Sequence, residues 1–196
     1  METLDTQTWI ILAAVVVLAL IAVGAWFFYQ KKQSHKLQER FGPEYGRTVS
    51  ELGSRAKGES DLKAREKRVE GLDILPLAPS EAARFSEAWQ ALQGRFVDNP
   101  KGVVVQAEQL VRELMEKRGY PMGDFERRAG DISVDHPDVV ANYRAAQAIA
   151  VRESRGSADT EELRKAVVHY RALFDELLEV REPKQEIIAE KRVAAR

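Results

Sequence analysis

The sequence predicts an all-α protein with an N-terminal transmembrane helix, a charged helical stalk and a compact four-helix, bundle-like domain. Three observations support this. One apolar block lies near the start, no convincing period-two alternation or Asn-Gly or Asp-Gly hairpin turn follows it, and apolar residues then recur at spacings of three and four. The predicted divisions are an external tail (1–8), the anchor (9–29), the stalk (30–75), the domain (76–181) and a charged tail (182–196).

The composition excludes several classes of function. The 196 residues carry 30 Lys+Arg and 31 Asp+Glu, a net charge of −1, and no cysteine. A chain without cysteine forms no disulfide, performs no thiol catalysis and holds no Cys-ligated metal. A near-neutral chain also lacks the basic excess that is typical of nucleic-acid binders. We therefore expect no nucleic-acid partner.

The apolar block runs from Trp9 to Tyr29 without a charged residue. As a helix it spans roughly 30 Å, because each residue rises about 1.5 Å, and this length matches a hydrocarbon core. Trp9, Trp26 and Tyr29 are expected at the two membrane interfaces, and Lys31 and Lys32 follow them. A cleaved signal peptide is the alternative, but the acidic start and the bulky aromatic end of the block argue against it.

The charges that flank the block predict its orientation. The only charged side chains before it are the acidic Glu2 and Asp5, whereas four Lys/Arg follow it within residues 31–40. The positive-inside rule places the basic flank in the cytoplasm. We therefore expect a single-pass protein of the inner cell membrane, with the N-terminus outside and the C-terminal domain cytoplasmic.

A basic stretch follows the anchor, with 11 Lys+Arg against 7 Asp+Glu over residues 31–72. Gly42-Pro43 should interrupt it, because a residue before proline avoids the helical region, and Pro43 can open the next helix. An approximate heptad repeat follows, and its seam consists of six residues: Thr48, Leu52, Glu59, Leu62, Glu66 and Val69. Half of the seam is polar, which does not secure a coiled coil. A solvated stalk is the main prediction, and a homodimer through it or contact with anionic lipid are alternatives.

Four long helices are expected after a stiff connector at residues 75–79. They open near Ser80, Pro100, Pro137 and Asp159, and a shorter helix is expected around 124–132. Each long helix carries one apolar face: Phe85, Trp89, Leu92 and Phe96; Val103, Ala107, Leu110 and Leu114; Val140, Tyr143, Ala146 and Ala150; Leu163, Val167, Tyr170, Phe174 and Leu177. Helices that bury one face each and are joined by short loops favour an antiparallel bundle.

The polar residues that could carry chemistry gather around the third of these helices. The candidate site comprises Asp131, Asp135, His136, Tyr143, Arg144 and His169. An Asp beside a His can orient the ring for acid–base catalysis or supply metal ligands. A structural interpretation is favoured, because Asp135 is placed to cap the helix that Pro137 opens. With no Gly-rich phosphate loop, GxSxG or HExxH motif in the chain, no catalytic residue, cofactor or metal is predicted.

Four stretches of the chain are distinctive. They are RFGPEYGRTV (40–49), GRFVDNP (94–100), RGYPMGDFERRAGDISVDHPDVVANYRAA (118–146) and ADTEELRKAVVHYRALFDELLE (158–179). They resemble a widespread bacterial family of single-pass membrane or predicted-secreted proteins of unknown function. The resemblance covers roughly residues 40 to 180 and implies no activity, cofactor or partner. Secretion would conflict with the predicted topology.

These observations lead to a non-enzymatic hypothesis. The chain is expected to be a membrane-tethered helical module that binds a protein partner, or acts as a scaffold, at the cytoplasmic face of the membrane. The alternative is a small-ligand sensor or enzyme that uses Asp131, Asp135, His136 and His169. If the apolar block is cleaved, the domain is exported instead.

Overall fold

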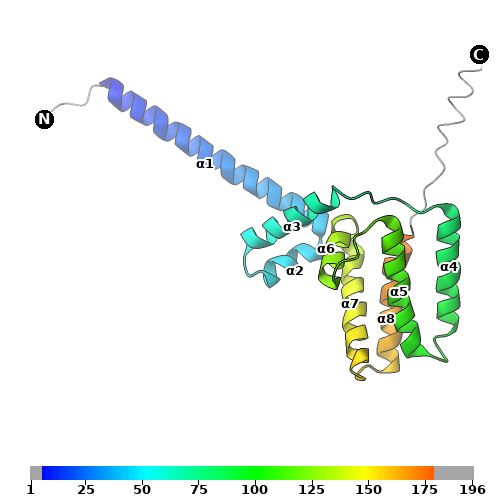
Figure 1. Ribbon diagram of the computed structural model, residues 1–196. Coiled ribbons are helices and arrows are strands. Elements are labelled where there is room, and N and C mark those ends of the chain that lie inside the picture. The colour runs from blue at the N-terminus through cyan, green and yellow to red at the C-terminus, as the bar shows by residue number, and fades with distance from the viewer. Residues whose placement is uncertain (1–5, 179–196) are drawn as a thin grey trace, which may run out of the picture. The chain divides into compact units, whose positions relative to one another are not determined.

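The computed structural model describes residues 6–178, and every regular element in that range is an α-helix, α1 to α8 (Figure 1). The all-α prediction is confirmed for this part of the chain. Residues 1–5 of the predicted external tail and the whole of the predicted charged tail (182–196) lie outside the described residues. The chain divides into two compact units, an N-terminal unit (Met1–Leu62) and a C-terminal unit (Lys63–Arg196).

The first helix, α1 (Thr6–Phe41), contains the apolar block and continues past it without a break. It is the one helix among the described residues that is long and apolar enough to span a membrane, and its most apolar window is not buried by the protein. Trp9, Trp26 and Tyr29 are each more than half exposed, and Lys31 and Lys32 are exposed as well. An apolar helix surface of this kind is typical of a membrane-spanning helix, and also of a signal sequence.

The predicted break at Gly42-Pro43 is confirmed. Gly42 has φ 47° and ψ −126°, a conformation that glycine adopts without the steric penalty of a Cβ, and Pro43 occupies the first turn of α2 (Pro43–Glu51). A second break, which no local pattern predicts, follows at residues 52–54. There Gly53 takes φ 65° before α3 (Arg55–Val69) begins.

The stalk is therefore not a single extended helix. The turn at 52–54 interrupts the seam of its predicted heptad repeat, and Leu52 in that seam is 42% exposed. The N-terminal unit instead buries residues of α1 and α2, among them Leu37, Phe41 and Thr48. Helix α3 lies close to α2, because a Cβ on Gly58 would stand 2.8 Å from Val49 Cγ2.

The C-terminal unit contains the end of α3 and five further helices. They are α4 (Pro79–Gly94), α5 (Pro100–Arg118), α6 (Phe125–Asp135), α7 (Pro137–Ser154) and α8 (Thr160–Leu177). Helix α5 packs against α4 and α8, α8 packs against α7, and the shorter α6 packs against α7 (Figure 1). The four long helices match those predicted, and α4 begins at Pro79, one residue before the predicted start near Ser80.

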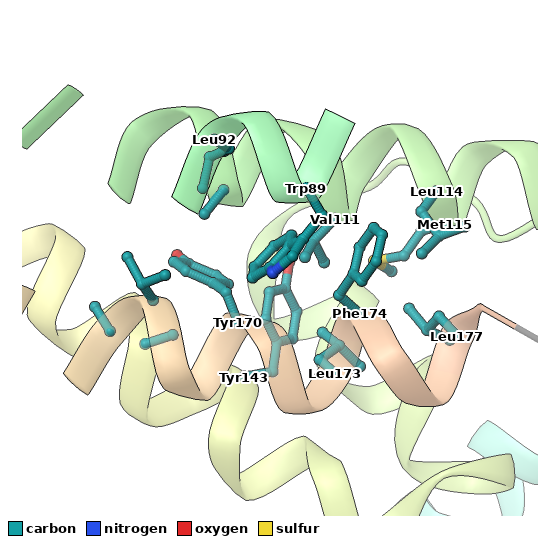
Figure 2. Packing of buried hydrophobic residues seen from close by; sticks show 14 of the residues in the cluster. Trp89, Leu92, Val111, Leu114, Met115, Tyr143, Tyr170, Leu173, Phe174 and Leu177 are labelled. Atoms are coloured by element: carbon teal, nitrogen blue, oxygen red, sulfur yellow. The ribbon is translucent and has the colours of Figure 1, made fainter. Parts of the chain in front are cut away.

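The core of this unit is formed by the predicted apolar faces (Figure 2). At its centre the ring of Trp89 from α4 stacks on that of Phe174 from α8, with centroids 4.6 Å apart. Tyr143 of α7 meets Tyr170 of α8 edge to face at 6.4 Å, and both residues are fully buried. Aromatic pairs in these geometries add to the stabilisation from buried area.

The segment before α4 is held against the end of α5. Leu75 N donates to Arg118 O at 2.9 Å. Gly119 ends α5 with φ 98°, and a Cβ there would lie 2.4 Å from Asp73 O. These contacts join the predicted connector to the C-terminal unit, and the division falls inside α3, between Leu62 and Lys63.

Candidate functional site

Helix α6 carries the most continuously buried stretch of the C-terminal unit. It begins after Asp124, whose side chain accepts a hydrogen bond from Arg127 N at 2.8 Å, and residues 128–134 are all buried. Arg128 and Asp131 are among them, so α6 places two charged groups in the interior. Buried charges need partners, because removal from water disfavours the charged form.

Asp131 is held by Arg68 of α3. Its Oδ1 accepts from Arg68 Nη2 at 2.6 Å and from Arg68 Nε at 2.7 Å, and Asp131 is fully buried while the Arg68 side chain is 29% exposed. The second oxygen, Oδ2, is buried without a hydrogen-bond partner in the described structure. Because Arg68 neutralises the carboxylate, we interpret Asp131 as one half of a structural ion pair.

Arg128 joins α6 to α7 through Tyr143. Its Nε donates to the Tyr143 hydroxyl at 3.1 Å, and its Nη1 donates to the carbonyl of Gly123. Burial raises the pKa of Tyr143, and the hydrogen bond from Arg128 opposes that rise. The hydroxyl therefore stays protonated at neutral pH and serves as the acceptor for Arg128.

Arg144 follows Tyr143 on α7 and also contacts α6. Its Nη1 donates to Glu126 Oε2 at 2.6 Å, and its guanidinium carbon stands 5.9 Å from the centre of the Phe125 ring. Phe125 in turn packs on Tyr143 with ring centroids 4.8 Å apart. The structure thus brings together two of the predicted site residues, Tyr143 and Arg144, through an aromatic ring.

His136 sits between α6 and α7 and is the N-cap residue of α7, without a side-chain cap bond. Its Nδ1 lies 3.0 Å from Glu176 Oε1 of α8. This corrects the predicted role of Asp135, which is the last residue of α6 and not the cap of α7.

His169 makes a separate contact, with Nδ1 2.8 Å from Asn142 Oδ1 of α7. Asn142 lies six positions after His136, and Glu176 lies seven positions after His169. At about 1.5 Å per residue, the two contacts are roughly 10 Å apart along the helices. The two histidines share no hydrogen-bond partner. Over residues 6–178 no group of three or more His, Asp or Glu residues could hold a metal ion.

The contacts around α6 to α8 join elements of the fold to one another. Asp131 binds Arg68, Tyr143 binds Arg128, Arg144 binds Glu126, and each histidine binds a residue of a neighbouring helix. No contact here favours the alternative of a ligand sensor or enzyme.

A second polar cluster lies in the N-terminal unit, within the region predicted to be a stalk. Glu59 Oε1 of α3 accepts from Arg55 Nε and from the Tyr45 hydroxyl, each at 2.8 Å, and Ser34 of α1 also hydrogen-bonds this carboxylate. Burial alone would raise the pKa of Glu59. The hydrogen bonds from Ser34, Arg55 and Tyr45 outweigh burial and hold that pKa below its usual value.

A cleft of about 690 Å³ opens beside this cluster, between α1 and α3, and Lys31, Ser34, His35, Gln38, Arg55 and Glu59 are among the residues that line it. Only the Arg55–Glu59 spacing of four was visible in the sequence. The other members come from different helices, and no local pattern links them.

Comparison of the chain with protein-family models, with curated proteins and with solved structures finds no match in any of the three. The resemblance to a bacterial family therefore depends on the four sequence stretches alone and stays a prediction.

Proposed function

We propose that this chain is a single-pass membrane protein whose helical units act at the cytoplasmic face of the membrane as a non-enzymatic interaction or scaffold module. The observation that carries the proposal is the surface of α1. Leu18 and Leu20 are each 66% exposed and Phe28 is 73% exposed, in a block of α1 that is apolar on all sides. Burial of each such side chain is worth about 1.5–3 kcal/mol, so lipid stabilises α1 strongly.

The proposed orientation follows from the exposed charges at one end of the apolar block. Lys31, Lys32 and Lys36 are all exposed on α1 beyond Tyr29, within the 15–20 residues over which the positive-inside rule acts. The rest of the N-terminal unit and the whole C-terminal unit follow this flank in the chain, and the proposal places them in the cytoplasm. Membership of the bacterial family that the sequence resembles is part of the same proposal.

A protein partner is proposed for the C-terminal unit. The polar side chains that suggested chemistry are engaged in contacts within the unit, which supports a structural role for them. A homodimer through residues 30–75 stays a prediction, weakened by the turn at 52–54.

The topology is tested with reporters fused to the C-terminus of the full chain. A reporter that works only in the cytoplasm should be active, and alkaline phosphatase, which needs export to fold, should be silent. The chain should also stay in the pellet after alkaline carbonate extraction. The opposite reporter pattern, or a mature N-terminus after Ala22 or Ala25, would overturn the proposal.

The partner is tested by proximity labelling from the C-terminus of the full chain, with residues 1–41 carrying the same label as the matched control. Proteins enriched with the full chain but not with the anchor are expected. Labelling that does not differ between the two would count against a partner for the helical units.

A further inference from the structure

The cleft between α1 and α3 lies close to the predicted membrane surface. Tyr29 is the last residue of the apolar block, and α1 continues as one helix to Phe41. At about 1.5 Å per residue, Lys31 lies roughly 3 Å and Gln38 roughly 13 Å beyond Tyr29 along the helix. The polar layer on each side of a bilayer is about 5–7 Å thick. Of the lining residues, Lys31 therefore falls at headgroup depth, and Gln38 falls beyond the headgroups on the aqueous side.

The cleft carries positive charge from two helices. Lys31 lines it from α1 and Arg55 from α3. The single negative group among the lining residues described above, Glu59, accepts from Arg55, Tyr45 and Ser34. Arg55 uses Nε for this contact, and its side chain is 58% exposed. A guanidinium has five N–H donors, so the Nη groups of Arg55 can still donate to an oxyanion.

The chemistry that such a site recognises is an anionic phosphate ester. Arginine donates to phosphate oxygens in a planar fork, and lysine adds a mobile point charge. Two sources present this group, a lipid headgroup and a soluble phosphate. The lipid is favoured by Phe28, which is 73% exposed on α1 and three residues before Lys31, so an acyl chain beside a bound headgroup would contact an apolar surface.

We infer that this cleft binds the phosphate headgroup of an anionic lipid through Lys31 and Arg55. The inference rests on the proposed membrane anchor. It goes beyond that proposal, since an anchor needs only hydrocarbon, whereas this site makes the N-terminal unit selective for the lipid that surrounds it.

The test uses the purified full chain in detergent, titrated with phosphatidylglycerol or with phosphatidylcholine and observed by native mass spectrometry. We expect one phosphatidylglycerol to bind at least tenfold more tightly than phosphatidylcholine. Loss of a hydrogen bond to a charged group weakens binding by at least about tenfold. Lys31→Gln and Arg55→Gln should therefore each weaken phosphatidylglycerol binding by about tenfold or more.

Two matched controls remove the same charge outside the cleft. Lys32→Gln changes the neighbouring exposed lysine on α1, and Lys57→Gln changes an exposed lysine two residues after Arg55, on the opposite side of α3. Both should bind phosphatidylglycerol within twofold of the wild type. Arg55→Gln also removes the pair with Glu59, so thermal unfolding is measured alongside. Lys31→Gln leaves that pair intact and tests the site independently.

Three results would overturn the inference. They are equal affinities for the two lipids, equal losses in Lys31→Gln and Lys32→Gln, or competition by soluble glycerol phosphate at the concentration that saturates the lipid. Carbonate extraction of the same proteins separates this failure from failure of the anchor. A chain that is retained in the membrane but shows no lipid preference refutes the site alone, whereas a chain released from the membrane refutes the proposed function.

Discussion

Helices α1 and α8 are both rich in large apolar side chains, yet these side chains are exposed in one helix and buried in the other. In the apolar block of α1 they surround the helix, and Leu18 and Phe28 are 66% and 73% exposed. In α8 they form one face, where Tyr170 and Phe174 are buried, while Val168 on the other side is 53% exposed. The angular distribution of apolar residues, not their number, decides whether a helix packs against protein or needs lipid.

The largest expected effect tests the buried half of this comparison. Phe174 is 1% exposed and stacks on Trp89, so Phe174→Ala should lower the free energy of unfolding of the C-terminal unit by about 3–5 kcal/mol. Val168→Ala, on the exposed side of the same helix, should change it by less than about 0.5 kcal/mol. Urea unfolding of the full chain in detergent measures both, and similar losses in the two variants would contradict the assignment of the faces.

A substitution by a charged residue tests the exposed apolar surface of α1. Leu18 lies near the middle of the apolar block, and Leu18→Lys should oppose membrane insertion by about 3 kcal/mol, because a lysine at the centre of a bilayer is poorly solvated. The fraction of chain released by alkaline carbonate should rise. Val168→Lys, an equal change on α8, should leave extraction unaltered. Retention of the Leu18→Lys chain at the wild-type level would contradict the placement of Leu18 near the centre of a bilayer.

An interior position can hold a charge where a partner is present. Arg68→Met would leave the buried Asp131 carboxylate without its partner and should lower the free energy of unfolding by about 3 kcal/mol, the lower end for such pairs because Arg68 is partly exposed. Adding Asp131→Leu should recover most of that loss, and Lys67→Met, at an exposed neighbour, should cost little. A double variant as unstable as the single would contradict the pairing.

A smaller effect is expected at the N-terminus of α8. Asp159 accepts from Glu162 N at 2.8 Å, and Glu162 Oε2 accepts from Asp159 N at 3.1 Å, which completes a capping box. Asp159→Ala should lower the free energy of unfolding by about 1 kcal/mol. Thr160→Ala, at the next position, serves as the control and should have a smaller effect in the same urea titration.

The smallest expected effect depends on pH. The pKa of Glu59 is held below its usual value of 4.5, so its carboxylate stabilises the fold above about pH 4.5, and that contribution is lost as the pH falls through the lowered pKa. The difference in Tm between the wild type and Glu59→Gln should therefore shrink on acidification. Tyr45→Phe removes one of the hydrogen bonds and should show part of the effect. A difference that is constant from pH 7 to pH 3 would refute it.

The elements that could be predicted are those whose signals are local. Proline at the first turn marks the starts of α2, α5 and α7, and spacings of three and four give the faces of α4, α5, α7 and α8. The predicted start of α8 near Asp159 is local in the same way, because the capping box found there links residues three apart. Such signals depend on neighbouring residues and so survive without knowledge of the tertiary fold.

What could not be predicted depends on contacts between distant residues. Arg68 and Asp131 are 63 positions apart, and nothing near either residue indicates the other. The cluster around Glu59 draws on three helices, and it appears only once the chain turns at Gly42 and again at Gly53. The candidate site was identified by residue type alone, which does not distinguish catalytic residues from those that join helices.

The unbroken course of α1 from the apolar block to Phe41 has a mechanical consequence. Twelve residues separate Tyr29 from Phe41, so with α1 in a membrane as proposed, roughly 18 Å of helix would stand beyond the hydrocarbon edge. Transmembrane helices respond to bilayer thickness by changing their tilt. A change of about 10° would displace the far end of such a lever by about 3 Å, so in a membrane the position of the α1–α2 corner would follow the thickness of the bilayer.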